Sequence, residues 1–324
     1  MTDRNATIEQ FLQVNGQGRA LRKALAGDAS VRRYERLVDG MVPAILMDCP
    51  PDRLDVRPFL RIATWLRRAG FSAPLIFAAD EGAGLVLMED LGDDLFSHVC
   101  RLPDEYGVDE EELYAAAVDV LVALQALETP ADLPAYDDEK MLEEASRFTR
   151  WYTPDLSDDA KADYLDLWRE LLPAARVGDD ALVYVDYHAD NLLWMQKRGG
   201  LAKVGLLDFQ DGRVGPPAYD LVSLLEDARR DVPPALAEVM IERYLQARSD
   251  LDAEAFRTSY AVLGAQRNCK ILGLFSRLAV EEGKTQYLAL QNRVRAHLQN
   301  DLAHPSLTEL AAWFDENLAL KIAS

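Results

Sequence analysis

The stretch Tyr184-Val185-Asp186-Tyr187-His188-Ala189-Asp190-Asn191 and the later run Leu206-Leu207-Asp208-Phe209-Gln210-Asp211 hold the most informative residues of the chain. They place an Asp, an Asn five positions later, and a second Asp seventeen positions beyond that. Each lies beside a short apolar run that predicts a strand. Taken singly, such Asp residues often only cap turns. Their shared spacing favours a site at which two carboxylates and an amide converge.

This residue set suits phosphoryl transfer from ATP. The reaction needs a carboxylate to accept a hydroxyl proton, and oxygen ligands for the Mg²⁺ that neutralises the phosphates. We assign the base to Asp186 and the metal ligands to Asn191 and Asp208. A hydrolase with His188 as its base is disfavoured, because the chain has no G-x-S-x-G motif to mark a nucleophile.

The sequence around this stretch divides into a β-rich part and a helical part. In the first part, hydrophobic patterns predict strands at 21–25, 31–37, 43–47, 74–79 and 85–88 and helices at 7–13 and 56–69. In the second, they predict helices at 113–127, 139–152, 158–174, 218–228, 234–247, 254–281 and 306–320, and strands near 182–185, 192–195 and 203–207. We therefore expect an α+β protein with an N-terminal antiparallel-sheet lobe over 1–91 and a larger, mainly helical lobe over 92–324.

Composition narrows the possible partners. The 324 residues carry a net charge of −20, the wrong sign for binding a nucleic acid backbone or an anionic membrane. The chain has neither a signal-like start nor an apolar run long enough to span a membrane, so we expect a cytoplasmic protein. Its three cysteines are far apart, which disfavours a disulfide framework or a zinc site. We expect a monomer whose partners are small molecules.

The motifs around Asp186, Asn191 and Asp208 resemble those of the aminoglycoside phosphotransferase-like kinases, and the resemblance extends over nearly the whole chain. More narrowly, residues 27–34, 45–51, 208–216 and 266–273 are similar to the anomeric N-acetylmuramate/N-acetylglucosamine kinases of bacterial cell-wall recycling. The resemblance implies a two-lobed protein-kinase-like fold that uses ATP and Mg²⁺. It also implies transfer of the γ-phosphoryl group to the anomeric C1 hydroxyl of an amino sugar, N-acetylmuramic acid or N-acetylglucosamine.

The nucleotide-binding part departs from the protein-kinase pattern. The turn at 27–30 has one glycine, so the Ser30 hydroxyl is a candidate phosphate ligand. The strand at 43–47 has no Lys for the phosphates, and the helix at 56–69 has no Glu to pair with one. We expect Arg33 to supply the missing cation, with Lys23 and Arg61 as alternatives. A solvated surface arginine explains Arg33 equally well.

The expected adenine site lies where the strand at 85–88 enters the connection between the lobes. By resemblance, the Glu89 carbonyl and the Leu91 amide hold the edge of the adenine, with Met88 behind it. Backbone contacts tolerate almost any side chain, so this prediction rests on the resemblance alone.

We expect the sugar-binding residues in the helical lobe, because saccharides bind through hydrogen bonds and through stacking on aromatic rings. Three candidates, Glu144, Arg147 and Trp151, share one face of the helix at 139–152, although a surface salt bridge beside a tryptophan explains that face equally well. Further candidates are Tyr152, Tyr187, His188, Gln210, Asp211 and Arg267. Asp220 resembles the buried family aspartate that steadies the catalytic loop, which implies a structural role.

Two alternatives remain open at this stage. One is a kinase of the same fold that acts on another hydroxyl, such as that of an aminoglycoside, choline or homoserine. The other is a nucleotide-binding regulator without catalysis, since the usual Lys and Glu pair is missing. The presence of Asp186, Asn191 and Asp208 weighs against the regulator.

Overall fold

The protein is described from a computed structural model, in which residues 4–25, 31–40 and 42–318 are placed. The chain forms two compact units. Unit 1 comprises Met1–Leu102 and Asp190–Asp211, and unit 2 comprises Pro103–Ala189 and Gly212–Ser324. Residues 190–211 thus join the N-terminal unit, whereas the sequence patterns grouped them with the helical lobe.

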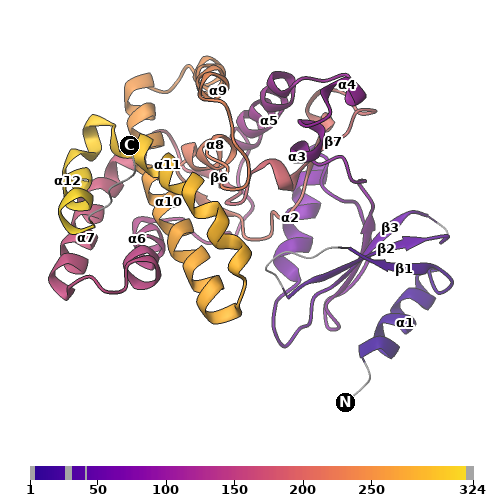
Figure 1. Cartoon of the computed structure of the whole chain (residues 1–324). Coiled ribbons are helices and arrows are strands. Elements are labelled where there is room, and N and C mark those ends of the chain that lie inside the picture. Colours follow the sequence, from indigo (N-terminus) through magenta and orange to yellow (C-terminus); the bar gives the residue numbers. More distant parts are fainter. Residues whose placement is uncertain (1–3, 26–30, 41, 319–324) are drawn as a thin grey trace. The chain divides into compact units, whose positions relative to one another are not determined.

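An antiparallel sheet forms the centre of unit 1 (Figure 1). Its spatial order is β1-β2-β3-β5-β4. The strands are β1 (Leu21–Ala24), β2 (Arg33–Val38), β3 (Ala44–Asp48), β4 (Ile76–Asp80) and β5 (Leu85–Glu89). Every neighbouring pair is antiparallel. The β1-β2-β3 meander predicted from the sequence is confirmed.

Two helices complete the early part of unit 1. The first, α1 (Arg4–Val14), buries one apolar stripe against the sheet, in a core of Ile8, Phe11, Leu12, Leu37, Ala44, Leu46, Leu85 and Leu87. The second, α2 (Arg57–Arg68), buries Phe59, Ile62, Ala63 and Leu66, the i, i+3, i+4, i+7 stripe of its sequence. It ends before Gly70, whose φ of +90° is a conformation that glycine adopts without steric cost.

Residues 190–211 belong to unit 1 because they pair with it. A short helix, η3 (Ala189–Asn191), leads into the hairpin β7 (Leu192–Trp194) and β8 (Val204–Leu206), with η4 (Gly200–Lys203) between its strands. Isolated bridges join Ser72 to Gly205 and Leu95 to Leu193, the latter just before α3 (Phe96–Val99). Phe209 stacks on Phe59 of α2, with 5.0 Å between ring centroids. These contacts fix the hairpin to the N-terminal unit.

Unit 2 is mainly helical, with one two-stranded sheet. Its helices are α4 (Pro103–Tyr106), α5 (Glu110–Gln125), α6 (Asp138–Arg147), η1 (Phe148–Tyr152), α7 (Asp158–Leu171), η2 (Leu172–Ala175), α8 (Ala218–Leu225), α9 (Pro234–Ala247), α10 (Ala253–Glu282), η5 (Thr285–Leu290), α11 (Gln291–Leu302), η6 (Pro305–Leu307) and α12 (Thr308–Asn317). Its strands are β6 (Ala181–Val183) and β9 (Arg213–Gly215).

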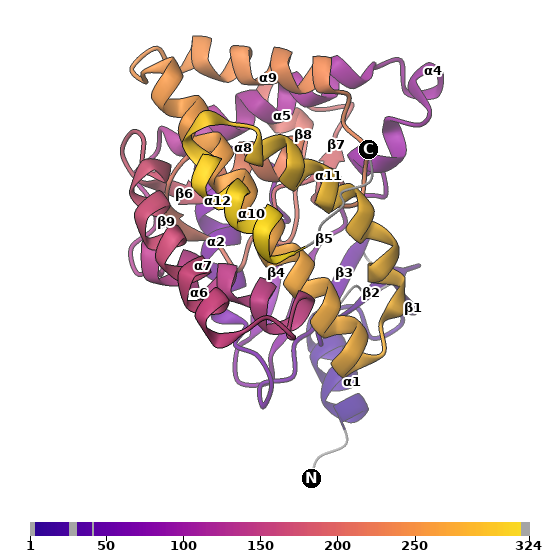
Figure 2. The same cartoon turned by 60° about the vertical axis from the view of Figure 1, so that its left-hand side comes forward.

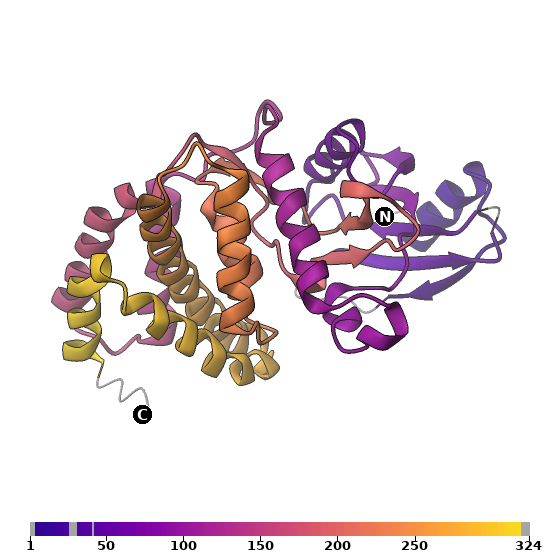
Figure 3. The same ribbon diagram turned by 90° about the horizontal axis from the view of Figure 1, so that it is seen from above.

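The long helix α10 organises unit 2. It packs against α6, α8 and α11 and is largely buried along its length (Figure 2). A second pair, α5 and α9, lies side by side in the view of Figure 3 and is linked by the Arg243–Asp119 ion pair at 2.7 Å. Asp109, which caps α5, accepts a hydrogen bond from the Glu112 amide.

The structure differs from the sequence expectations in several segments of unit 2. The helices α4 and α11 were not predicted. The helix expected over 139–152 ends as an α-helix at Arg147, and its last turn, η1, is a π-helix. Strand β9, of three residues, has no periodicity that a sequence could reveal. Among the described residues, Cys49, Cys100 and Cys269 form no disulfide. No helix in the described ranges is long and apolar enough to cross a membrane.

Candidate active site

Asp186 lies in a strained and otherwise buried loop of unit 2. Within residues 181–189 it is the one position that is not buried. The residue before it, Val185, has a φ of +78°, a conformation that is a genuine outlier for a β-branched side chain. Strain of this kind persists only where surrounding contacts impose it, and it is typical of functional sites. Within this buried loop, the Asp186 side chain is therefore the one that solvent or a ligand can reach.

Two side chains of α8 hold this loop. Asp220 accepts hydrogen bonds from the backbone amides of Tyr184, at 2.5 Å, and Val185, at 2.9 Å. Ser223 Oγ, one helical turn later, donates to the Val185 carbonyl at 3.3 Å. Both polar groups of the Val185 backbone are thus fixed by α8. These are the contacts expected of Asp220 from the resemblance.

Burial makes the charged form of the Asp220 carboxyl group energetically unfavourable. Its side chain is 1% exposed, and burial raises its pKa to about 7, helped by the nearby charge of Asp186. The two amide donors act in the opposite direction, because hydrogen bonds to a carboxylate favour its charged form. The two amide hydrogen bonds offset part of this cost and hold the loop that carries Asp186.

Tyr187 and His188, two predicted sugar ligands, point into unit 2. Tyr187 is fully buried, and its hydroxyl donates to the Ala117 carbonyl at 2.8 Å. His188 is also buried; desolvation, followed by the charge of Arg229, holds its pKa well below the usual value. Both side chains are better placed to anchor the loop than to contact a sugar.

In unit 1, the β7–β8 hairpin brings the two predicted metal ligands to one end. Leu192 pairs with Leu206, and the Leu207 amide donates to the Asn191 carbonyl at 3.0 Å. In this register Asn191 lies opposite Leu207, the residue directly before Asp208, so the two predicted metal ligands lie near each other at the end of the hairpin. Asp208 is exposed and has a φ of +60°. The sequence alone could predict this proximity only if the two short runs were correctly paired.

The groups at this end of the hairpin fit Mg²⁺, which prefers oxygen ligands and takes few of them from protein. Gln210, another predicted sugar ligand, donates from Nε2 to Asp208 at 2.7 Å and to Asp211 at 3.2 Å. Its Oε1 is buried and accepts no hydrogen bond from the described residues. No group of three or more His, Cys, Asp or Glu in those residues could hold a metal ion. An amide and one carboxylate, completed by phosphate oxygens, is the arrangement expected for Mg²⁺-ATP.

A different arginine from the predicted one, Arg32, directly precedes β2 and shares its electrostatic surroundings with this acidic segment. Burial raises the pKa of Tyr34 to about 12; Arg32 lowers it, and Asp208 and Asp211 raise it. Tyr34 and Arg32 alternate with Arg33, which is exposed. Arg32 and Tyr34 therefore lie on the same side of the chain, and this side is within electrostatic range of Asp208 and Asp211. The predicted phosphate ligand Ser30 lies outside the described residues.

The predicted adenine-binding segment ends the β5 strand. Met88 is buried and pairs with Ile45 of β3. The Glu89 side chain accepts from Arg198, at 2.7 Å, and from the Leu75 amide, at 3.2 Å. These bonds fix the strand end that leads to Leu91, and they leave no role in adenine binding for the Glu89 carboxylate.

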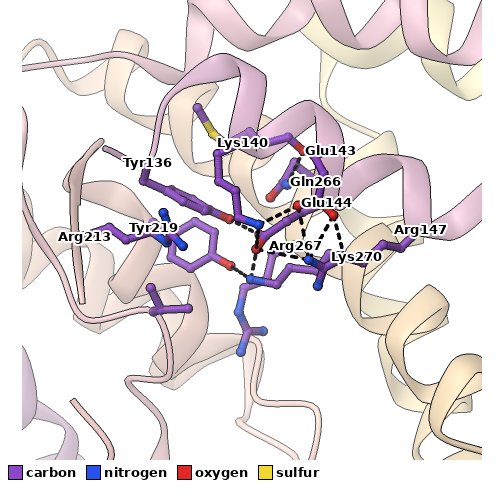
Figure 4. A network of polar contacts seen from close by, with 12 residues as sticks. Tyr136, Lys140, Glu143, Glu144, Arg147, Arg213, Tyr219, Gln266, Arg267 and Lys270 are labelled. Atoms are coloured by element: carbon purple, nitrogen blue, oxygen red, sulfur yellow. Dashed lines mark hydrogen bonds and ion pairs between the residues drawn. The ribbon is translucent and has the colours of Figure 1, made fainter. Parts of the chain in front are cut away.

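The predicted sugar ligands on α6 separate in the structure. Glu144 is buried and accepts a hydrogen bond from the Tyr136 hydroxyl at 2.7 Å (Figure 4). Arg147 is half-buried and lies 3.1 Å from Glu143. Trp151 follows in the π-helical turn, so the expected i, i+7 alignment with Glu144 is lost. Its ring lies 5.6 Å from the Arg150 guanidinium carbon.

Arg267 of α10, also predicted as a sugar ligand, is only 4% exposed. It donates to Ser223 Oγ at 2.9 Å and to the Glu226 carbonyl at 3.3 Å. Through Ser223, it supports the Val185 carbonyl and thus the loop that carries Asp186. Lys270, one turn further along α10, was not singled out from the sequence. It lies within 266–273, one of the segments that carry the family resemblance, but no pattern in the sequence distinguishes it from the other charged residues of this helix.

Comparisons with known proteins agree with this geometry. The profile of the "Phosphotransferase enzyme family" matches residues 22–256. The N-acetylmuramate/N-acetylglucosamine kinase of Caulobacter vibrioides is 38% identical over 356 residues, covering 97% of this chain and 96% of that protein.

Two solved structures share the fold at low sequence identity. A choline/ethanolamine kinase family protein from Mesorhizobium loti has a TM-score of 0.64 at 15% identity, covering 97% of this chain and 100% of that one. The aminoglycoside phosphotransferase APH(2'')-Ib, in its ADP-bound form, has a TM-score of 0.58 at 15% identity. The match covers 90% of this chain and 96% of that one. At this identity the likeness concerns the fold alone.

Proposed function

The chain belongs to the phosphotransferase enzyme family and is a small-molecule kinase, and from this premise we propose that it phosphorylates the anomeric C1 hydroxyl of N-acetylmuramic acid or N-acetylglucosamine with ATP. Its fold is the protein-kinase-like fold expected from the sequence. The product, a sugar 1-phosphate, suits a role in peptidoglycan recycling. The choice of sugar is supported by the relative's name and its near-complete coverage.

The observation that carries the proposal is the strained loop that exposes Asp186. Asp220 and Ser223 fix both polar groups of the Val185 backbone, so the next carboxylate is held before a substrate arrives. An anomeric hydroxyl is more acidic than an ordinary alcohol, so a carboxylate is an adequate base for it. Asp186 accepts that proton as the oxygen attacks the γ-phosphorus. Positioning supplies much of the rate in such a reaction.

The nucleotide is assigned to unit 1. Asn191 and Asp208 would hold Mg²⁺, and Gln210 orients the Asp208 carboxylate. When bound, the ion neutralises charge on the phosphates during transfer. A chain with a net charge of −20 needs such local compensation to accept anionic ATP.

A panel of acceptors tests the proposed function. The chain is incubated with Mg-ATP and N-acetylmuramate, N-acetylglucosamine, an aminoglycoside, choline or homoserine, and phosphorylated products are identified by mass spectrometry. We expect phosphorylation of the two amino sugars. Preferred phosphorylation of any other acceptor would contradict the proposal, and nucleotide binding without turnover would favour a regulator.

The Arg32 face of β2 leads to a prediction about ATP. Arg32→Ala should raise the KM for ATP by roughly 10-fold, the usual effect of one charged hydrogen bond, with a smaller change in kcat. Arg33→Ala, on the exposed face, is the matched control and should stay within about 2-fold of the unmodified chain. Initial rates at varied ATP measure both. The reverse pattern would restore Arg33 as the phosphate-binding cation.

The hold of Asp220 on the loop leads to another prediction. Asp220→Asn keeps one hydrogen-bond acceptor but places its NH₂ group against a backbone N–H. The Val185 backbone should then leave its strained conformation, and the Asp186 carboxylate should move with it. We expect kcat to fall by about 10²-fold, as for a displacement of about 1 Å, with both KM values nearly unchanged. Asp250→Asn, at an exposed ion pair of unit 2, is the control. A rise in KM without a loss of kcat would argue against a positioning role.

A further inference from the structure

A buried lysine of α10 has no role in the proposed reaction so far. Lys270 Nζ lies 2.7 Å from Glu144 Oε2 and donates to the Tyr219 hydroxyl at 3.2 Å (Figure 4). An ammonium group has three donors, and these two contacts use two of them; the group also lies 5.7 Å from the centre of the Tyr136 ring. The side chain is 12% exposed. Lys270 can therefore donate one hydrogen bond to a ligand.

The position of Lys270 depends on close contact between α10 and α6. A Cβ on Gly273 would lie 2.4 Å from the carbonyl carbon and oxygen of Arg147, so only glycine permits this approach. One helical turn earlier on each helix, the contact brings Lys270 to Glu144. Glu144 also lies 3.4 Å from Lys140 and accepts from the Tyr136 hydroxyl. The lysine is thus rigidly placed.

Lys270 lies within electrostatic range of the proposed base. Burial opposes its charge, but Tyr219, Glu144 and Asp186 together raise the pKa of Lys270 above its ordinary value. The ammonium therefore stays charged at neutral pH. A group of the acceptor that lies near Asp186 is therefore also within range of the Lys270 charge.

Three cations gather at two carboxylates in this part of unit 2. Lys140, Arg147 and Lys270 each form an ion pair with Glu143 or Glu144 (Figure 4). Lys140 and Arg147 face the same two glutamates from positions about 10 Å apart along α6.

We propose that the basic cluster, defined as Lys140, Arg147 and Lys270, binds a carboxylate of the acceptor and selects an acidic amino sugar over its neutral counterpart. This inference rests on the proposed function, and it names the residues that distinguish N-acetylmuramate, which carries a carboxylate, from N-acetylglucosamine, which does not. Charge-assisted hydrogen bonds to a carboxylate are stronger than neutral ones, and they are lost when the carboxylate is absent.

Replacing the lysine tests this selectivity. Lys270→Gln should lower kcat/KM for N-acetylmuramate by roughly 10- to 100-fold, the usual loss for a charged hydrogen bond, and leave kcat/KM for N-acetylglucosamine within about 3-fold. Arg147→Gln should show a smaller loss with the same selectivity. Arg277→Gln, at an exposed ion pair on the same helix, is the control and should change neither value.

Two further measurements separate the possible outcomes. If Lys270→Gln does not fold, the double variant Lys270→Gln/Glu144→Gln removes both charges and leaves neither buried without a partner. NMR titrations of both sugars without ATP should show that the unmodified chain prefers N-acetylmuramate and that the variant loses this preference. An equal loss for both sugars overturns the inference. The NMR titration tests the inference about sugar binding even if neither sugar is phosphorylated. A lack of phosphorylation would contradict the proposed function but not this inference.

Discussion

Replacing Asp186 with Asn should lower kcat by about 10³-fold, within the range that a positioned general base contributes. Asn has nearly the same shape but cannot take the proton of the attacking hydroxyl. Because Asp220 and Ser223 hold Val185 through its backbone, the loop should keep its conformation in the variant. Nucleotide affinity, measured by calorimetry with Mg-ATP, should stay within about 3-fold, since the proposed nucleotide ligands lie in unit 1.

Asp179→Asn is the matched control for this experiment. Asp179 is an exposed aspartate of unit 2, seven positions before Asp186, and its replacement should leave kcat unchanged. Thermal unfolding of both variants checks that the fold is retained. If Asp186→Asn keeps more than about a tenth of the kcat of the unmodified chain, Asp186 is not the base.

Replacing Asp208 with Ala should have an effect of similar size, for a different reason. The change removes the one carboxylate assigned to Mg²⁺ and leaves the Gln210 amide without its partner at 2.7 Å. Because the metal contributes several kcal/mol of charge stabilisation, we expect kcat to fall by about 10³-fold or more. A titration of rate against Mg²⁺ should show weaker apparent metal binding in any residual activity.

The control for the metal experiment is Asp52→Asn, at an exposed position of unit 1. It should not change the dependence of the rate on Mg²⁺. Removal of divalent cations with a chelator should abolish turnover of the unmodified chain, and Mg²⁺ should restore it. Unchanged turnover in the Asp208 variant would remove this residue from the metal site.

Most of the fold follows from local patterns in the sequence. The stripe of Phe59, Ile62, Ala63 and Leu66, followed by Gly70, predicted both the buried face and the end of α2. The alternating runs of β1 to β3 predicted their antiparallel meander. Strand β9 was missed because its three residues form a strand only through pairing with β6.

The site was predictable only in part. The spacing of Asp186, Asn191 and Asp208 identified the chemistry, because each residue follows or precedes a strand that could be recognised. The alternation of side chains along a strand predicts that Arg32 and Arg33 lie on opposite faces. Which of the two faces lies near Asp208 depends on the three-dimensional fold and could not be predicted from the sequence. Lys270 meets its partners through a helix contact that no local pattern specifies.

The position of the transferred phosphate tests the central claim most directly. The product formed from N-acetylmuramate and Mg-ATP is analysed by ³¹P NMR and by an assay for the reducing end of the sugar. We predict a phosphate coupled to the anomeric proton, together with loss of the reducing end. A phosphorylated sugar that keeps its reducing end would contradict transfer to C1.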